Sequence, residues 1–126
     1  EALRGKRVGL VDDSLVRGNV MTGLISLLRK EYGVAAVHVR ILCPPIDKPC
    51  HLGINTRSAD ELIVVQLDGD LGRVQKAIGA DSLAFLSDSG LREAFVGNPQ
   101  AEGFCMGCMV GHRPPVDRDG TVFRVV

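Results

Sequence analysis

Two adjacent carboxylates, Asp12 and Asp13, follow a short apolar run and precede a polar, glycine-containing segment at residues 14–19. Neighbouring carboxylates can bind a divalent cation such as Mg²⁺ or accept hydrogen bonds from two sugar hydroxyls. The segment after them leads into an expected helix, whose first backbone N–H groups and dipole favour a phosphate. Gly18 would let the backbone approach a ligand closely. The pattern predicts a site for a phosphorylated sugar.

Two other interpretations of the acidic pair stay open at this point. The pair can simply end a strand, with Asn19 as the cap of the following helix. An acidic pair after an apolar strand also opens the receiver domains of two-component signalling. A receiver needs a further aspartate after its third strand and a Lys-Pro after its fifth. Asp68 lies rather far along the chain for the first role, and the only Lys-Pro, Lys48-Pro49, lies in the wrong half.

The cysteines are the second group of residues that could carry out chemistry or bind a metal. Cys105 and Cys108 make a C-x-x-C in a glycine-rich stretch, and Cys50 and Cys43 lie much earlier in the chain. Such a pattern fits zinc, an iron–sulfur cluster, a redox pair or chance. Because the chain shows no sign of secretion, reduced or metal-bound thiols are favoured over disulfides.

Composition limits the class of protein. The 126 residues are 45% hydrophobic and 24% charged, and 15 Lys and Arg balance 15 Asp and Glu. This length suits one domain, and this charge balance disfavours a basic nucleic-acid binder or a disordered acidic tail. No apolar run approaches the roughly 18 residues of a membrane span, and no signal peptide is evident. We therefore expect a cytoplasmic protein without nucleic-acid or membrane partners.

Because the chain begins with Glu1 instead of Met, we expect a piece of a longer protein.

Hydrophobic periodicity predicts alternating strands and helices. A strand, a helix and a second strand at the start form a right-handed βαβ unit, which predicts an α/β fold with a parallel sheet. The helix from Val20 should be capped by Asn19 and end near Gly33, and a capping box at Ser58–Glu61 should begin another helix. The other expected elements are strands at 6–11, 35–42, 82–86 and 121–126, and helices at 71–78 and about 89–96.

A resemblance to a known family appears at residues 8–18, Val-Gly-Leu-Val-Asp-Asp-Ser-Leu-Val-Arg-Gly. This stretch resembles the phosphoribosyl pyrophosphate (PRPP) motif of type I phosphoribosyltransferases, in the form typical of glutamine amidophosphoribosyltransferases. The likeness extends from about Gly5 to about Pro115. Further stretches fall in that family's order at residues 37–41, 44–50, 53–56, 61–63, 78–83 and 104–108.

The resemblance implies a fold and an activity. The fold would be a partial parallel sheet of the type I phosphoribosyltransferase kind, with flanking helices over 1–97 and a Cys-containing C-terminal tail, 98–126, packed on the same domain. The activity would be formation of 5-phosphoribosylamine from PRPP and glutamine-derived ammonia, in de novo purine synthesis. In the family, the glutaminase half and the pyrophosphate-binding segments lie upstream. We therefore expect the chain alone to be incomplete and inactive, and the complete protein to be a homo-oligomer.

The resemblance also implies roles for single residues, although no catalytic residue is assigned. Asp12 and Asp13 would contact the ribose hydroxyls of PRPP and help place Mg²⁺. The family has two Thr after the glycine, where this chain has Asn19 and Val20, and a Val side chain cannot donate a hydrogen bond. A non-catalytic phosphosugar-binding or nucleotide-binding homologue is therefore the alternative. The residues that would wrap the 5′-phosphate are Ser14, Leu15, Val16, Arg17, Gly18, Asn19 and Val20.

The same resemblance bears on the thiols. Some members carry a 4Fe–4S cluster, and three of its ligands align with Cys50, Cys105 and Cys108, while the fourth lies upstream of the region present here. Cys43 stands where the family commonly has Ser, so we interpret it as a small buried residue. The remaining alternative is a structural module whose thiols bind metal to support folding.

Overall fold

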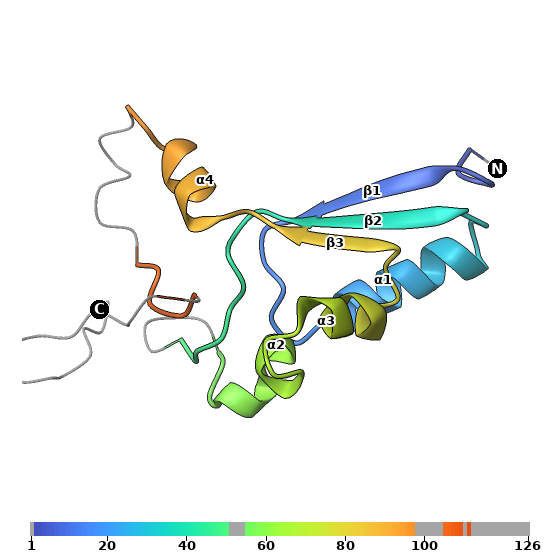
Figure 1. The fold of residues 1–126 in the computed structure, drawn as a ribbon. Helices are drawn as coiled ribbons and strands as arrows, with labels where there is room; N and C mark the ends of the chain where they lie inside the picture. The colour runs from blue at the N-terminus through green and yellow to red at the C-terminus, as the bar shows by residue number, and fades with distance from the viewer. Residues whose placement is uncertain (1, 51–54, 98–104, 110, 112–126) are drawn as a thin grey trace, which may run out of the picture.

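Three parallel strands form the sheet of this protein. The computed structural model describes residues 2–50, 55–97, 105–109 and 111. The strands are β1 (Arg7–Asp12), β2 (Ala36–Ile41) and β3 (Ser82–Phe85), in the order β1-β2-β3 (Figure 1). Both strand pairs are parallel. The α/β class, the parallel sheet and the positions of these strands are therefore confirmed.

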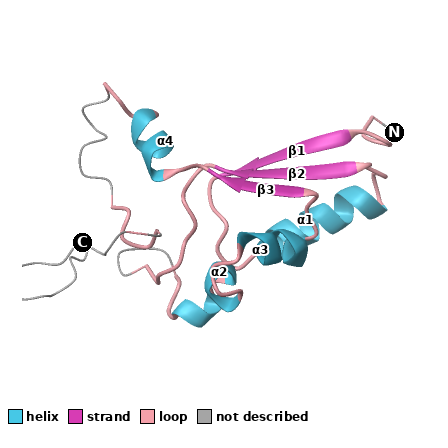
Figure 2. Ribbon diagram, viewed as in Figure 1, coloured by secondary structure: helices cyan, strands magenta, loops and turns pink. Residues whose placement is uncertain are grey.

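Two helices cover one face of this sheet. They are α1 (Asn19–Lys30) and α3 (Leu71–Ile78), which lie side by side beneath the strands (Figure 2). Both helices place apolar side chains at helical spacing toward the central strand, whose own inward residues are fully buried. The core that results consists mainly of Met21, Ile25 and Leu28 from α1, Val37, Val39 and Ile41 from β2, and Val74 and Ile78 from α3.

The start of α1 corrects one expectation. Gly18, not Asn19, is the N-cap, and it has a left-handed backbone (φ +79°) that a residue with a side chain rarely adopts. Asn19 is instead the first helical residue. At α3, in contrast, the local signals are confirmed: Asp70 caps the helix by accepting a hydrogen bond from the Arg73 N–H at 3.0 Å, and Gly79 follows its last residue.

The remaining helices are shorter than the sequence predicts. The capping box at Ser58 produces only a 3₁₀ turn, η1 (Ala59–Glu61), and then the single turn of α2 (Ile63–Gln66). The Ser58 side chain makes no capping hydrogen bond to the helix. Helix α4 (Asp88–Glu93) begins after Ser87, whose hydroxyl accepts from the Gly90 N–H, and ends earlier than expected.

No described helix lies over the opposite face of the sheet (Figure 1), where several polar side chains contact one another. The His38 ring contacts Arg7 Nη2 at 3.2 Å and Ser82 Oγ at 2.9 Å. Arg40 also donates to Ser82 Oγ, at 3.1 Å. His38 is therefore a sheet residue on the less buried face.

Residues 105–109 lie near the carboxyl end of the sheet. Met109 forms an antiparallel bridge with Ile46, which follows β2. The strand expected over 121–126 lies outside the described residues. In the part of the chain that the structure describes, no helix has the length and apolar character needed to cross a bilayer.

Candidate functional site

The acidic pair lies where β1 ends. Asp12 is the last residue of that strand, and its carbonyl accepts a hydrogen bond from the Leu42 N–H at 2.9 Å, which ties this end of β1 to β2. The Asp12 carboxylate accepts from the Asp13 N–H at 3.0 Å, and the Asp13 carboxylate accepts from Ser14 Oγ at 3.1 Å. Both carboxylates remain exposed at the carboxyl edge of the sheet, where open α/β sheets bind ligands.

The loop that follows is anchored at three points. Leu15 is 3% exposed and belongs to the core, so it fixes the middle of the loop. The Val16 carbonyl accepts a hydrogen bond from the Ile63 N–H at 2.9 Å. A Cβ added to Gly18 would lie 2.6 Å from Ile63 Cδ1, so only glycine fits there without a shift. The β1–α1 loop is therefore held against the segment that contains η1 and α2.

Backbone donors of the loop are available for a ligand. Among the described residues, the N–H groups of Ser14 to Gly18 have no hydrogen-bond acceptor. The loop leads directly into α1, whose first turn carries no acidic residue. Successive N–H groups and the positive end of a helix dipole form a favourable environment for a phosphate. The loop can therefore bind an anion without a cationic side chain.

Arg17 does not belong to that set of donors, because its guanidinium is directed toward a different segment. Its Nε donates to Glu61 Oε2 at 2.9 Å, its Nη2 also bonds Glu61, and Nη2 donates to the Asn55 carbonyl at 2.7 Å. The Arg17 side chain is the main cause that lowers the pKa of Glu61. The resemblance had placed Arg17 among the residues that would wrap the 5′-phosphate, and the direction of its guanidinium is known only from the structure.

Glu61 is a residue of this site that sequence reasoning missed. The Ser-x-x-Glu spacing assigned its carboxylate a local role at a helix start. In the structure Glu61 does accept from the nearby Arg57 N–H at 3.3 Å, but its other oxygen pairs with Arg17, 44 residues earlier. The only sequence signal for this contact is the arginine in the β1–α1 loop, which the resemblance had assigned to the phosphate instead.

The two residues that depart from the family pattern lie in the first turn of α1. Asn19 is exposed and Val20 is 83% exposed. Val20 continues an exposed apolar row on α1 with Leu24 and Leu27, separate from the buried row that faces the sheet. The Val20 side chain can therefore add no hydrogen bond to an anion bound by the loop.

The thiol region lies near the same end of the sheet. The Cys108 carbonyl accepts hydrogen bonds from the Asp47 and Lys48 N–H groups, both at 3.1 Å, so the 105–109 turn is joined to the segment after β2. Cys43 is only 6% exposed, in agreement with a small buried residue. Burial raises the pKa of the Cys43 thiol to about 11, and the charges of Cys108 and Asp13 add to the effect.

The chemistry of the thiols suits a metal, but the described residues do not form a complete metal-binding group. Burial raises the pKa of Cys108, and the charges of Cys50 and Cys105 raise it further. A cation would reverse this by stabilising thiolates, the ligands that iron–sulfur clusters and zinc prefer. Within the described ranges, however, no three Cys, His, Asp or Glu side chains are grouped closely enough to hold a metal ion.

The chain is similar in sequence to amidophosphoribosyltransferases. It is 41% identical over 122 residues to the enzyme of Drosophila melanogaster, which covers 90% of this chain and 22% of that protein. It is also 41% identical over 115 residues to the enzyme of Archaeoglobus fulgidus, which covers 90% of this chain and 24% of that protein. No protein-family model matches the chain. The chain thus spans about a quarter of the length of these relatives.

Solved structures give the same result. The chain is similar to the glutamine PRPP amidotransferase from B. subtilis complexed with ADP and GMP, with 36% identity and a TM-score of 0.74, over 95% of this chain and 26% of that one. It is similar to a structure described as the allosteric regulatory enzyme of purine biosynthesis, with 37% identity and a TM-score of 0.75, over the same shares. The resemblance expected from the sequence is confirmed.

Proposed function

We propose that this chain is the sugar–phosphate-binding part of an amidophosphoribosyltransferase, which forms 5-phosphoribosylamine from PRPP and glutamine-derived ammonia in purine synthesis. One observation carries the proposal: exposed carboxylates at the end of β1 lead into an anchored loop whose N–H groups are unpaired at the start of α1. The relatives named amidophosphoribosyltransferase support the same assignment.

The chain's own residues would act mainly by positioning the substrate. Asp12 and Asp13 would accept hydrogen bonds from the ribose hydroxyls and hold Mg²⁺, and the N–H groups of Ser14 to Gly18 would bind the 5′-phosphate. Ammonia would then displace pyrophosphate from the ribose C1, with one C–N bond formed and one C–O bond broken. When bound, Mg²⁺ supplies charge neutralisation for the leaving pyrophosphate. Fixing the ribose in this way lowers the entropy cost of the displacement.

The thiols and the remaining parts of the enzyme complete this proposal. Cys50, Cys105 and Cys108 would supply three of the four ligands of a 4Fe–4S cluster, because thiolates are the ligands that such clusters use. The 98–126 tail would pack on the same domain as 1–97. A glutaminase part of the longer protein would supply ammonia, and the complete enzyme would be a cytoplasmic homo-oligomer.

Calorimetric titration with PRPP, with and without Mg²⁺, tests the sugar site. We expect Asp13→Asn to weaken Mg²⁺-dependent PRPP binding by tenfold or more, or about 1.4 kcal/mol. The reason is that the negative charge and one of the two acceptor oxygens of the carboxylate are lost. Asp68→Asn is the matched control. The Asp68 side chain is 82% exposed, and Asn tolerates its positive φ. Equal PRPP affinity in both variants and the wild type would overturn the proposal.

The activity of the isolated chain is a separate test. With PRPP, Mg²⁺ and ammonia, we expect the chain to release no pyrophosphate above the uncatalysed rate, since the resemblance places the pyrophosphate-binding segments upstream. The longer protein that contains this sequence should release pyrophosphate under the same conditions. Turnover by the isolated chain would contradict this expectation and make the upstream segments dispensable.

A non-catalytic phosphosugar-binding or nucleotide-binding homologue is the second candidate, favoured by the exposed Val20 in the first turn of α1. Replacing Asn19 and Val20 by Thr in the longer protein separates the two candidates. An amidophosphoribosyltransferase should gain activity or keep it, since two hydroxyl donors are restored near the phosphate. A binding-only homologue should bind PRPP in both forms and stay inactive in both.

A further inference from the structure

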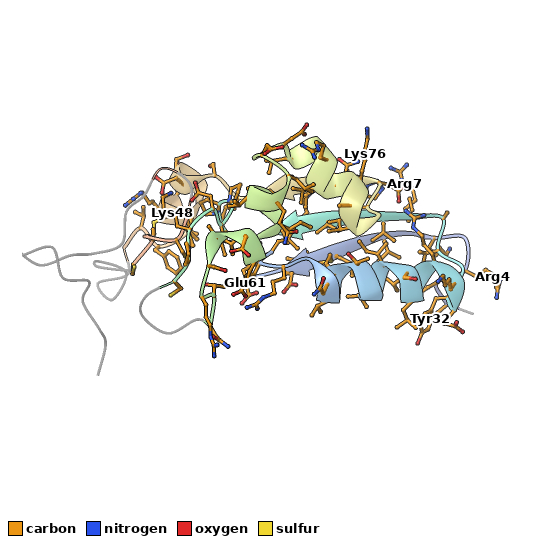
Figure 3. All side chains as sticks on the ribbon, turned by 90° about the horizontal axis from the view of Figure 1, so that it is seen from below. Arg4, Arg7, Tyr32, Lys48, Glu61 and Lys76 are labelled. Atoms are coloured by element: carbon orange, nitrogen blue, oxygen red, sulfur yellow. The ribbon has the colours of Figure 1, made fainter. Side chains whose placement is uncertain are left out.

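Arg17 and Glu61 join the β1–α1 loop to a segment far away in the sequence. Figure 3 shows Glu61 near the start of α1, between Lys48 on one side and Arg4 and Tyr32 on the other, at the opposite end of that helix. The Arg17 guanidinium bonds the Glu61 carboxylate through two of its nitrogens and donates to the Asn55 carbonyl at 2.7 Å. Arg17 is therefore occupied by the 55–61 segment and is not directed at the unpaired N–H groups of its own loop.

The same segment also contacts the residues on both sides of Arg17. The Ile63 N–H donates to the Val16 carbonyl at 2.9 Å, and the Ile63 side chain fills the space beside Gly18. Leu62, between Glu61 and Ile63, is completely buried and anchors the segment in the core. Three consecutive loop residues are thus braced by one core-anchored segment, and the ion pair is the charged part of that brace.

A hydrogen bond within its own segment also helps to orient the Glu61 carboxylate. Its Oε1 accepts from the Arg57 N–H at 3.3 Å, which leaves Oε2 for the guanidinium. The Arg17 and Glu61 side chains are 45% and 27% exposed, so the pair contributes little to global stability. Its larger effect falls on the loop, because ordering a flexible loop on binding costs affinity that a pre-ordered loop retains.

We propose that Glu61 is a positioning residue for the sugar–phosphate site, which acts by holding Arg17 so that the loop's N–H groups are ordered before the phosphate arrives. This inference rests on the proposed function for its ligand, but the bracing of the loop can be measured without any ligand. The competing arrangement has Arg17 leaving Glu61 to contact the phosphate directly.

Binding of PRPP with Mg²⁺, and of ribose 5-phosphate alone, distinguishes the two arrangements. If Glu61 positions the loop, Glu61→Gln weakens both ligands by about fivefold to tenfold, as expected for loss of a charge-assisted hydrogen bond. The double variant Glu61→Gln, Arg17→Gln should then bind no more weakly than Arg17→Gln alone, because the two residues act as one unit. If Arg17 contacts phosphate directly, Glu61→Gln releases it and binding stays equal or becomes tighter, which overturns the proposal.

Backbone ¹⁵N order parameters of the ligand-free chain give the second readout. Glu61→Gln should lower the order parameters at Ser14 to Gly18 and leave those of α3 unchanged. Asp68→Asn is the control, since it breaks a different exposed ion pair, with Arg73 at 2.8 Å. Unchanged loop order overturns the positioning role even if PRPP binds. If Glu61→Gln lowers the loop order while the wild type binds no PRPP, that result would support the role of Glu61 in ordering the loop and would overturn the proposed function.

Discussion

The β1–α1 loop and the thiol region lie at the same end of the sheet but are built in different ways. The loop is a run of consecutive residues held by one buried side chain, one tight glycine contact and one bracing segment. The thiol region joins two segments far apart in the sequence, through a bridge between Ile46 and Met109 and two hydrogen bonds to the Cys108 carbonyl. The loop thus depends on side chains of the core, whereas the thiol region is held largely by backbone.

This difference predicts how each region responds to substitution. A change in the loop's anchors should alter both stability and sugar binding, because the same contacts set both. A change at a cysteine side chain should alter metal binding and leave the fold largely intact, because the joining hydrogen bonds use main-chain atoms. Four substitutions test this contrast.

Leu15→Ala should have the largest effect. Leu15 is 3% exposed in the core cluster, and removing a buried Leu side chain lowers the free energy of unfolding by about 3 kcal/mol. Urea denaturation followed by circular dichroism measures the loss. Leu24→Ala, at a side chain that is 38% exposed on α1, is the control and should cost less than about 1 kcal/mol. Equal costs at the two positions would refute the anchoring role of Leu15.

Gly18→Ala should lower the free energy of unfolding by about 2 kcal/mol. The left-handed backbone disfavours any Cβ, and this Cβ would also press on Ile63 Cδ1. Gly69 is the matched control, since it has a similar φ of +74° but nothing within 4 Å of an added Cβ. Gly69→Ala should therefore cost only about 1 kcal/mol, the conformational part alone. If the two variants melt alike, the Ile63 contact has no role in fixing the loop.

Cys108→Ser should change stability by less than about 1 kcal/mol, because the Asp47 and Lys48 hydrogen bonds reach its carbonyl and not its thiol. In the longer protein, reconstituted with iron and sulfide without oxygen, the same variant should lose bound iron and the brown colour. Cys43→Ser is the control and should keep its iron. Unfolding of the chain by Cys108→Ser alone would instead favour the structural metal module.

The pH dependence of the Glu61 contribution is the smallest effect. Arg17 lowers the pKa of Glu61 from its ordinary 4.5, so the pair stabilises the fold above that pH. The contribution is lost as pH falls through the lowered pKa, where Glu61 becomes protonated. The melting temperatures of the wild type and Glu61→Gln should differ at about pH 6, and the difference should shrink as the pH falls below 4.5 and Glu61 becomes protonated. Added salt should also reduce the difference, because both side chains are partly exposed. A difference in melting temperature that increases at low pH would contradict the conclusion that the ionised Glu61 stabilises the fold.

Local sequence patterns predicted the structure correctly where the contacting residues are close together in the sequence. Asp70 caps α3 through Arg73, three residues away, and the alternating apolar residues of β2 gave that strand its position. The same reasoning was wrong at Asn19 and incomplete at Ser58–Glu61. At the N-cap, Ile63 leaves no room for a Cβ, so that position suits Gly18. The Glu61 carboxylate pairs with Arg17. Both partners come from another segment, so no local pattern could reveal them.

The sequence by itself determined the parallel α/β framework, the acidic pair at the end of β1 and the glycine before α1, because apolar periodicity and residue type report on contacts within one element. Only the tertiary structure decided which way Arg17 points, which residue holds it, and that the 105–109 turn joins the segment after β2. These features depend on which segments pack together in space. Burial of the Leu62 and Leu15 side chains fixes that packing, and short-range spacing carries no information about it.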